Sequence, residues 1–261
     1  MNSLLNITPI SDWNSELSQP LLIAGPCSAE SEIQVMETAN ALAKEGKVKV
    51  FRAGIWKPRS RPGSFEGAGE VGLKWLQKVK RETGLLVTTE VATAMHAQKA
   101  LEYGIDMVWV GARTTANPFS VDQLVAVLKD ANVPVLVKNP VTPDLELWIG
   151  AIERFYRAGI TKLAAIHRGF YPYERSRLRN IPKWELAIDL KSRFPNLPVI
   201  CDPSHIAGLA GLIHEIAQHA LDLSFDGLMV EVHPNPPAAL SDAKQQLPPK
   251  EFSDLINALT F

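Results

Sequence analysis

Eight short apolar runs recur along the 261-residue chain, and each is followed by polar or turn residues and then by a helical pattern. The runs are PLLIAG, VKVFRAG, LLVTTEV, DMVWVGA, VPVLVKN, KLAAIHRG, LPVICDP and GLMVEVHP. Runs that are apolar at nearly every position belong to strands buried on both faces, which is typical of parallel sheets. Between them, apolar residues recur at three- and four-residue spacing, which predicts helices. These helices are expected at residues 29–44, 72–82, 94–103, 121–129, 145–157, 184–194 and 209–220.

Eight strands that alternate with helices in a chain of this length predict an α/β fold of the (β/α)8 barrel (TIM barrel) type. The alternative is an open doubly wound sheet, which normally has fewer strands and a glycine fingerprint after the first one. The segment GPCSAE after the first run is not that fingerprint. We therefore expect a single barrel domain over residues 21–261, with a short N-terminal extension or cap over residues 1–20.

Composition argues against several classes of protein. Lysine and arginine number 27 against 28 acidic residues, so nothing in the charge balance favours nucleic acid or a membrane surface as a partner. No apolar run approaches the length of a membrane span, and the first residues lack a signal-peptide pattern. Two cysteines far apart in sequence do not form a disulfide framework. We expect a cytoplasmic protein with reduced thiols.

Positive charges are concentrated after the predicted strands. In a (β/α)8 barrel the active site lies at the carboxyl ends of the strands, so these side chains share one rim. The cations at these positions are Arg52, Lys57, Arg59, Arg113, Lys138 and Arg168. Like charges at one rim repel each other, and two or three cationic partners satisfy one phosphate. These six cations therefore predict that the site binds two phosphate groups, or two phosphate groups and a carboxylate.

A second cluster combines soft and hard metal ligands: Cys27, His205, Glu231 and Asp242. They follow the first, seventh and eighth strands, which are neighbours in a closed barrel. A thiolate, an imidazole and two carboxylates suit Mn²⁺, Fe²⁺, Co²⁺ or Zn²⁺, and mixed ligands favour a catalytic Lewis acid. The alternatives are a buried, purely apolar role for Cys27 and a helix N-terminal role for Asp242.

Eight motifs in order carry a resemblance to a known family. They are AGPCSAES, FRAGIWKPRS, GART, VKNP, IHRGF, CDPSH, MVEVHP and LSDAKQQL. Together they strongly resemble 3-deoxy-D-arabino-heptulosonate-7-phosphate (DAHP) synthase of the short bacterial type I-beta. The resemblance implies condensation of phosphoenolpyruvate with erythrose 4-phosphate, the first step of the shikimate pathway and hence of aromatic amino acid biosynthesis. It implies one divalent metal on Cys27, His205, Glu231 and Asp242, with Mn²⁺ expected before Fe²⁺, Co²⁺ or Zn²⁺.

The resemblance also implies roles at the substrates. The phosphoenolpyruvate phosphate would be held by Arg113, Lys138 and Arg168 and by the backbone around Ala112. Its carboxylate would be held by Arg52, Lys57 and Lys138. The phosphate of erythrose 4-phosphate would be held by Arg59 and by Ser60, where family members usually have threonine. The candidates for proton transfer are Lys57, expected first as the acid, Glu90 and His205.

Three other functions stay open. The related 3-deoxy-manno-octulosonate-8-phosphate synthase typically has a KANR-type sequence where this chain has Lys57-Pro58-Arg59-Ser60, which favours the four-carbon aldose phosphate. A Schiff-base aldolase would use Lys57 or Lys138 and need no metal. A non-catalytic sensor of phosphorylated ligands is the third. Relatives are usually homo-oligomers, and a chorismate mutase domain or partner is left open.

Overall fold

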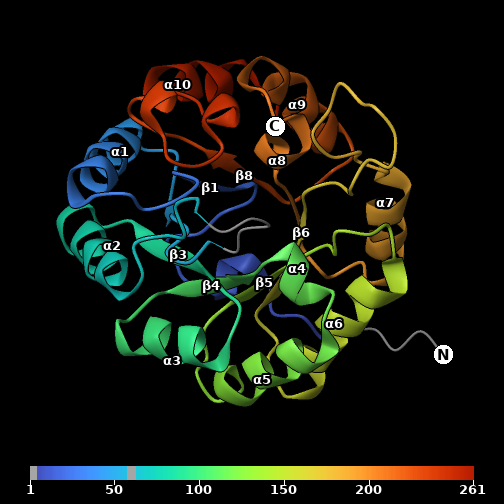
Figure 1. Ribbon diagram of the computed structural model, residues 1–261. Coiled ribbons are helices and arrows are strands. Elements are labelled where there is room, and N and C mark those ends of the chain that lie inside the picture. Colours follow the sequence, from blue (N-terminus) through green and yellow to red (C-terminus); the bar gives the residue numbers. More distant parts are fainter. Residues whose placement is uncertain (1–4, 58–62) are drawn as a thin grey trace.

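The computed structural model describes residues 5–57 and 63–261, and its eight parallel strands pair in sequence order and close on themselves (Figure 1). The strands are β1 (Leu21–Gly25), β2 (Val50–Arg52), β3 (Leu86–Val91), β4 (Met107–Val110), β5 (Val135–Lys138), β6 (Leu163–His167), β7 (Val199–Cys201) and β8 (Gly227–Glu231). Closure comes from the pairing of β1 with β8, from Leu21 opposite Gly227 to Gly25 opposite Glu231. The predicted barrel is confirmed, and the open sheet is excluded.

Helices surround the barrel on the outside (Figure 1). They are α1 (Glu32–Glu45), α2 (Glu70–Thr83), α3 (Ala94–Glu102), α4 (Ala112–Thr115), α5 (Pro118–Leu128), α6 (Leu145–Arg157), α7 (Trp184–Arg193), α8 (Pro203–Ala207), α9 (Ile213–Asp222) and α10 (Pro249–Ala258). The helix expected from residue 29 begins only at Glu32, because the Ser31 side chain caps it by accepting a hydrogen bond from the backbone N–H of Gln34. The helix expected from residue 209 begins at Ile213, after a short 3-10 turn.

Two short helices were not predicted, and both matter for the site. Helix α4 begins directly after β4 and carries Arg113, and helix α8 begins directly after β7 and carries His205. Four and five residues are too few to show an apolar period, so the sequence pattern does not reveal them. Each places a polar side chain at the carboxyl end of the barrel.

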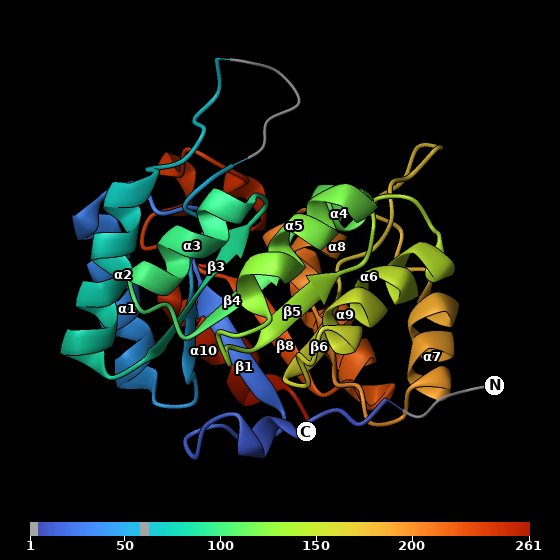
Figure 2. The same ribbon diagram turned by 90° about the horizontal axis from the view of Figure 1, so that it is seen from below.

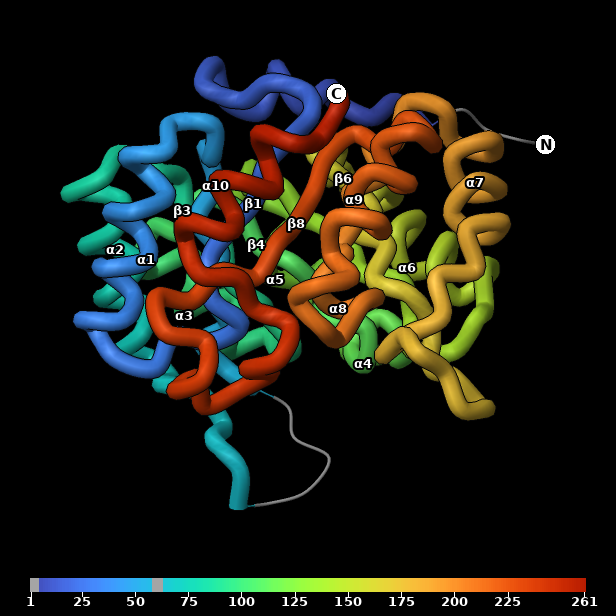
Figure 3. Tube along the Cα trace, turned by 90° about the horizontal axis from the view of Figure 1, so that it is seen from above, coloured from blue at the N-terminus to red at the C-terminus, as the bar shows by residue number. Residues whose placement is uncertain are grey.

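The N-terminal segment covers the opposite end of the barrel, as Figures 2 and 3 show in deep blue. Its buried side chains Ile10, Trp13 and Leu17 join the cluster that fills the barrel interior, with Ile23 and Trp109 among its members. A larger apolar cluster fills the space between the strands and the surrounding helices. Because one end is closed by apolar packing, solvent and ligands reach the barrel from the carboxyl ends of the strands. Within the described residues no helix is long and apolar enough to cross a bilayer.

His167 is a titratable group buried in the layer between barrel and helices. It is fully buried at the end of β6, and its ring centroid lies 5.1 Å from that of Trp184, 6.3 Å from that of Trp148 and 6.0 Å from that of Phe225. Burial, assisted by the positive charge of Arg168, lowers the pKa of His167 to about 3. The imidazole is therefore neutral in the folded protein at neutral pH.

This burial predicts a pH-dependent stability. The unfolded chain binds a proton at His167 below its ordinary pKa of about 6.5, whereas the folded protein binds it only near pH 3. The free energy of unfolding therefore falls as the pH drops through this window, by up to about 1.4 kcal/mol per pH unit from this residue. Urea unfolding at pH 7.5, 6 and 5 should show a flatter profile for His167→Phe than for wild type. Parallel profiles would contradict the assignment.

Candidate active site

The carboxyl ends of the strands surround a polar cavity of about 410 Å³. The residues predicted from the sequence that line it are Lys57, Glu90, Ala112, Arg113, Lys138, Arg168, His205 and Asp242. Arg52, Cys27 and Glu231 are buried and are not among the residues that line it. Arg59 and Ser60, predicted to bind the second phosphate, lie outside the described residues. Within the described residues, one rim therefore carries Lys57, Arg113, Lys138 and Arg168 of the predicted cations together with the predicted metal-ligand types.

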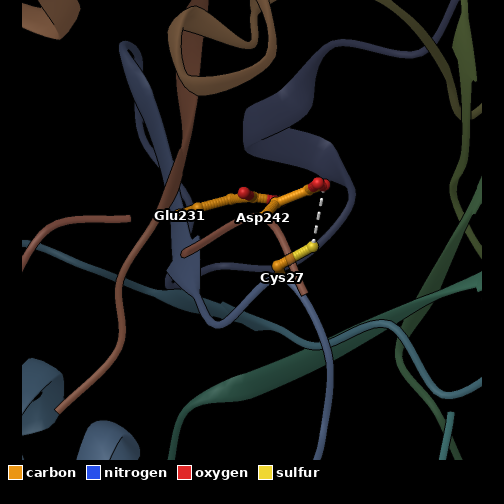
Figure 4. Close-up of side chains that lie close together, drawn as sticks. All are labelled: Cys27, Glu231 and Asp242. Atoms are coloured by element: carbon orange, nitrogen blue, oxygen red, sulfur yellow. Dashed lines mark hydrogen bonds between the residues drawn. The ribbon is translucent and has the colours of Figure 1, made fainter. Parts of the chain in front are cut away.

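Cys27, Glu231 and Asp242 converge at the closure of the barrel (Figure 4). The sulfur of Cys27 and one carboxylate oxygen from each acid all lie within 4.8 Å of one another. The pairing of Gly25 with Glu231 brings Cys27, two residues further on, to this point. Gly25 has φ +148°, and a Cβ there would lie 2.1 Å from the carbonyl oxygen of Arg52, so only glycine allows the strands to approach this closely.

His205 faces the same cluster from helix α8. Its Nε2 lies 3.8 Å from Oε1 of Glu231 and 3.9 Å from Oδ2 of Asp242, while its Nδ1 lies 2.8 Å from Oδ2 of Asp202. A histidine whose Nδ1 faces a carboxylate presents Nε2 as a ligand atom. The four side chains predicted to hold a metal thus lie together.

Basic groups balance the charge of this cluster. Nη2 of the buried Arg52 lies 3.2 Å from Oε1 of Glu231, and Nζ of Lys57 donates to the sulfur of Cys27 at 3.0 Å. Burial, with Glu231 and Asp242 nearby, raises the pKa of Cys27 to about 12 in opposition to Lys57 and Arg52. A divalent cation would reverse this balance, since metal binding deprotonates a coordinating thiol. The mixed sulfur, nitrogen and oxygen donors fit a first-row transition metal.

Three cations line the wall of the cavity beside this cluster. Lys138 ends β5 and is 4% exposed, Arg168 follows β6, and Arg113 lies in α4. Burial, with Arg179 and Arg113 as neighbours, lowers the pKa of Arg168 to about 10, so it stays charged at neutral pH. A partly buried wall of like charges is suited to a polyanionic ligand such as a phosphate ester.

Comparison with known proteins places this geometry in a family. The chain matches the model of the DAHP synthetase I family over residues 14–260. The chain belongs to the DAHP synthetase I family. It is 34% identical to the phospho-2-dehydro-3-deoxyheptonate aldolase of Thermotoga maritima over 91% of this chain and 68% of that protein. A 2-dehydro-3-deoxyphosphooctonate aldolase of Desulfotalea psychrophila is 30% identical, over 92% of this chain and 89% of that one.

Solved structures agree with the sequence comparison. The crystal structure of the Thermotoga maritima phospho-2-dehydro-3-deoxyheptonate aldolase (DAHP synthase) superposes with a TM-score of 0.82 at 34% identity, covering 91% of this chain and 67% of that one. A truncated form of the Thermotoga enzyme gives a TM-score of 0.79 at 32% identity, over 91% and 84% of the two chains. The protein is therefore an enzyme of a family that forms carbon–carbon bonds, and the family generally uses a divalent metal.

Glu90 is held in a defined place in this DAHP synthetase I barrel. Its Oε2 accepts a hydrogen bond from Nε1 of Trp109 at 2.9 Å. A Cβ on Gly111 would lie 2.3 Å from Oε1 of Glu90, so the glycine leaves room for this carboxylate. The carboxylate lies on the cavity wall together with Lys57.

Several site residues escaped the sequence prediction. Arg179 and Asn180 line the cavity from the loop between β6 and α7, although in sequence they lie far from any strand end. Nη1 of Arg179 lies 3.1 Å from Oδ1 of Asp242 and also donates to Gln245. Gln245 in turn donates to Oε2 of Glu231 at 2.7 Å. The pair of glutamines three and four residues after Asp242, in LSDAKQQL, is the one sequence signal that could have pointed to this support.

Gly208 permits the approach of Arg179 to the cluster. This C-cap of α8 has φ +71°, and a Cβ there would lie 2.5 Å from Cβ of Arg179. We predict that Gly208→Ala displaces Arg179 from Asp242 and weakens Mn²⁺ binding. Gly84 is a matched control, because this C-cap of α2 has φ +74° with nothing near the added Cβ. Both variants should lose about 1–2 kcal/mol of stability through backbone strain.

Chelator competition and thermal unfolding distinguish the two effects in these glycine variants. Only Gly208→Ala should show a raised dissociation constant for Mn²⁺. Equal Mn²⁺ affinity in the two variants would show that Arg179 does not position Asp242.

Proposed function

We propose that this protein is a 3-deoxy-7-phosphoheptulonate synthase that condenses phosphoenolpyruvate with D-erythrose 4-phosphate and water to give DAHP and phosphate. The observation that carries the proposal is the juxtaposition, on one barrel rim, of a Cys-His-Glu-Asp cluster and a cationic cavity wall. Membership of the DAHP synthetase I family supports it. The cluster suits a Lewis acid and the wall suits phosphorylated anions, which are the two requirements of the reaction.

Cys27, His205, Glu231 and Asp242 would hold one divalent metal, with Mn²⁺ as our first choice. When bound, such an ion supplies Lewis acidity to the aldehyde oxygen or to the attacking water. Arg113, Lys138 and Arg168, with the backbone at Ala112, would hold the phosphoenolpyruvate phosphate. Its carboxylate would be met by Arg52, Lys57 and Lys138, and the second phosphate by Arg59 and Ser60.

The bonds that form and break in the condensation require proton transfers near the cavity wall. C3 of phosphoenolpyruvate bonds to the aldehyde carbon, whose oxygen takes up a proton, and C2 is left electron-poor. Water then adds to C2 and loses one proton, which gives a hemiketal phosphate. The C2–O bond to phosphate breaks and phosphate departs with the electron pair, while the remaining C2 hydroxyl becomes the carbonyl group and its proton passes to the departing phosphate. Lys57 would donate the proton to the aldehyde oxygen, and Glu90 would receive the proton from water. His205, the other candidate from the sequence, would serve as a base only without the metal, because its Nε2 would otherwise hold the metal while its Nδ1 faces Asp202. The arginines would orient the substrates and stabilise charge rather than transfer protons.

The setting of the reaction is part of the proposal. Residues 21–261 would form the catalytic barrel and residues 1–20 its extension, in a cytoplasmic homo-oligomer. A chorismate mutase partner stays a prediction of the family resemblance.

An octulosonate synthase is the second candidate, because relatives named 2-dehydro-3-deoxyphosphooctonate aldolase match at 30% identity. An eight-carbon product requires a five-carbon aldose phosphate in place of the four-carbon one. The sequence Lys57-Pro58-Arg59-Ser60 favours the four-carbon substrate over the alternative. Parallel assays of phosphoenolpyruvate with each aldose phosphate separate the two activities.

Removal of the metal should abolish product formation. We expect phosphoenolpyruvate and erythrose 4-phosphate to give DAHP and phosphate with Mn²⁺, no product with EDTA, and recovery when Mn²⁺ is added back. Cys27→Ala should lose both bound Mn²⁺ and activity, whereas Cys201→Ala should retain both, because Cys201 is buried in β7 away from the cluster. Full activity in EDTA, with borohydride trapping of substrate, would instead indicate an imine mechanism.

Loss of a wall cation should weaken binding of one substrate. Replacement of Arg168 by Gln removes a charge-assisted interaction worth about 1.5–3 kcal/mol, so KM for phosphoenolpyruvate should rise about 10- to 100-fold. The KM for erythrose 4-phosphate should change far less. Arg154→Gln is the control, since Arg154 pairs with Asp122 on the outer helices. An equal rise in both KM values would refute the assignment of Arg168 to phosphoenolpyruvate.

A further inference from the structure

Asp202 connects the cation wall to the metal-ligand cluster. It is fully buried, and its Oδ2 lies 2.8 Å from Nζ of Lys138 and 2.8 Å from Nδ1 of His205. Its Oδ1 accepts a hydrogen bond from the backbone N–H of His205 at 3.1 Å, which caps helix α8. One carboxylate oxygen is thus shared between a side chain that faces the anion and a side chain that faces the metal cluster.

Asn180 makes a second connection between the same two parts of the site. Its Oδ1 accepts a hydrogen bond from Nη1 of Arg168 at 2.9 Å, and its Nδ2 donates to the carbonyl oxygen of His205 at 2.6 Å. Asn180 is 5% exposed, and its backbone N–H donates to the carbonyl oxygen of Ile206. Two cations of the wall are therefore each connected through one buried residue to His205.

We propose that Asp202 and Asn180 couple the two ligands, so that a divalent metal on the cluster and a phosphorylated anion on the cation wall strengthen each other's binding. This inference rests on the proposed function. It makes Asp202 and Asn180 positioning residues, since each acts through side chains that contact the ligands.

The sign of the coupling follows from the sharing of Oδ2. A metal held by Nε2 would withdraw electron density from the imidazole, which would strengthen the attraction between its Nδ1 edge and the Asp202 carboxylate 2.8 Å away. The carboxylate is then held more by His205 and less by Lys138, whose ammonium becomes available to the anion. In reverse, an anion that attracts Lys138 would weaken the interaction of Lys138 with Asp202. Asp202 would then interact more strongly with His205 and make its Nε2 a better ligand atom. Reciprocity of this kind is required of any equilibrium coupling.

Asn180 contributes by geometry rather than charge. Its amide fixes the Arg168 guanidinium relative to the backbone of His205, so the placement of His205 in the metal cluster and the placement of Arg168 at the anion would constrain each other. Direct attraction between a metal cation and a substrate anion also gives positive coupling, and it acts in every variant. The contribution of Asp202 and Asn180 to the coupling is therefore measured by the difference between the coupling in wild type and the coupling in each variant.

The experiment measures coupling without turnover. The dissociation constant for Mn²⁺ is obtained by competition with a fluorescent chelator, with and without saturating phosphoenolpyruvate and in the absence of any aldose phosphate. We expect phosphoenolpyruvate to tighten Mn²⁺ binding at least 10-fold in wild type, within the usual range of about 5- to 150-fold. This coupling ratio should fall at least fivefold in Asp202→Asn and at least twofold in Asn180→Ala. Calorimetric titration of phosphoenolpyruvate with and without Mn²⁺ must give the same ratio.

The variants and their control make the test specific. Asparagine still caps helix α8, so Asp202→Asn should fold, which thermal unfolding checks. Asp226→Asn is the matched control, because Asp226 accepts hydrogen bonds from Lys191 at 2.6 Å and from the backbone of Val199 at 2.8 Å, at the other end of β7. Its coupling ratio should equal that of wild type. A purely structural role for Asp202 would weaken both ligands and leave the ratio unchanged.

The outcomes separate this inference from the proposed function. An unchanged ratio in both Asp202→Asn and Asn180→Ala, in a protein that forms DAHP, overturns the coupling alone. Coupled binding of Mn²⁺ and phosphoenolpyruvate without any DAHP overturns the proposed function alone. Failure of wild type to bind phosphoenolpyruvate overturns both.

Discussion

The pairing of β1 with β8 is the interaction on which the rest of the site depends. It closes the barrel and sets Gly25 opposite Glu231, so that Cys27 meets the end of the last strand. The chain then returns over the same point, because the N–H of Leu247 donates to the carbonyl oxygen of Glu231. That return carries Asp242 back to Cys27, whose sulfur donates to its Oδ2 at 3.3 Å. Residues more than 200 positions apart thereby form one cluster.

Much of this arrangement could be predicted from the sequence, for two physical reasons. Strands covered on both faces must be apolar throughout, so eight runs were visible and the parallel barrel followed from them. Parallel strands also bring all their carboxyl ends to one rim, so residues as distant in sequence as Lys57 and Arg168 are predicted from the sequence alone to surround one cavity, and both line it. The convergence of Cys27 with Glu231 follows from closure of the barrel alone, because closure makes the last strand the neighbour of the first. What each residue binds was implied by family resemblance and not by these rules.

The parts that the sequence did not reveal are those fixed by tertiary contacts alone. Arg179 reaches Asp242 because the loop after β6 folds back on α8 and Gly208 leaves it room, and no periodicity encodes such a contact. The sequence gives Asn180 no feature that separates it from other loop residues. Only the tertiary structure places its amide between Arg168 and the backbone of His205. Asp202 lies at the end of the apolar run LPVICDP, but the sequence does not show that it contacts both Lys138 and His205, because that contact depends on how β5, β7 and α8 pack together.

These connections also explain how so many charges coexist in a buried rim. A buried ion is costly unless its partners compensate it, and removal of one partner is more damaging than absence of the pair. Arg52 is compensated by Glu231 and by the face of Trp109, whose ring centroid lies 4.9 Å away. Lys138 is compensated by Asp202. An anion that binds Lys138 would leave the Asp202 carboxylate without its cationic partner, unless positive charge is added near His205. A metal cation on its own would add positive charge near His205 without an anion at Lys138. The state with both ligands therefore restores the compensation that either ligand alone removes.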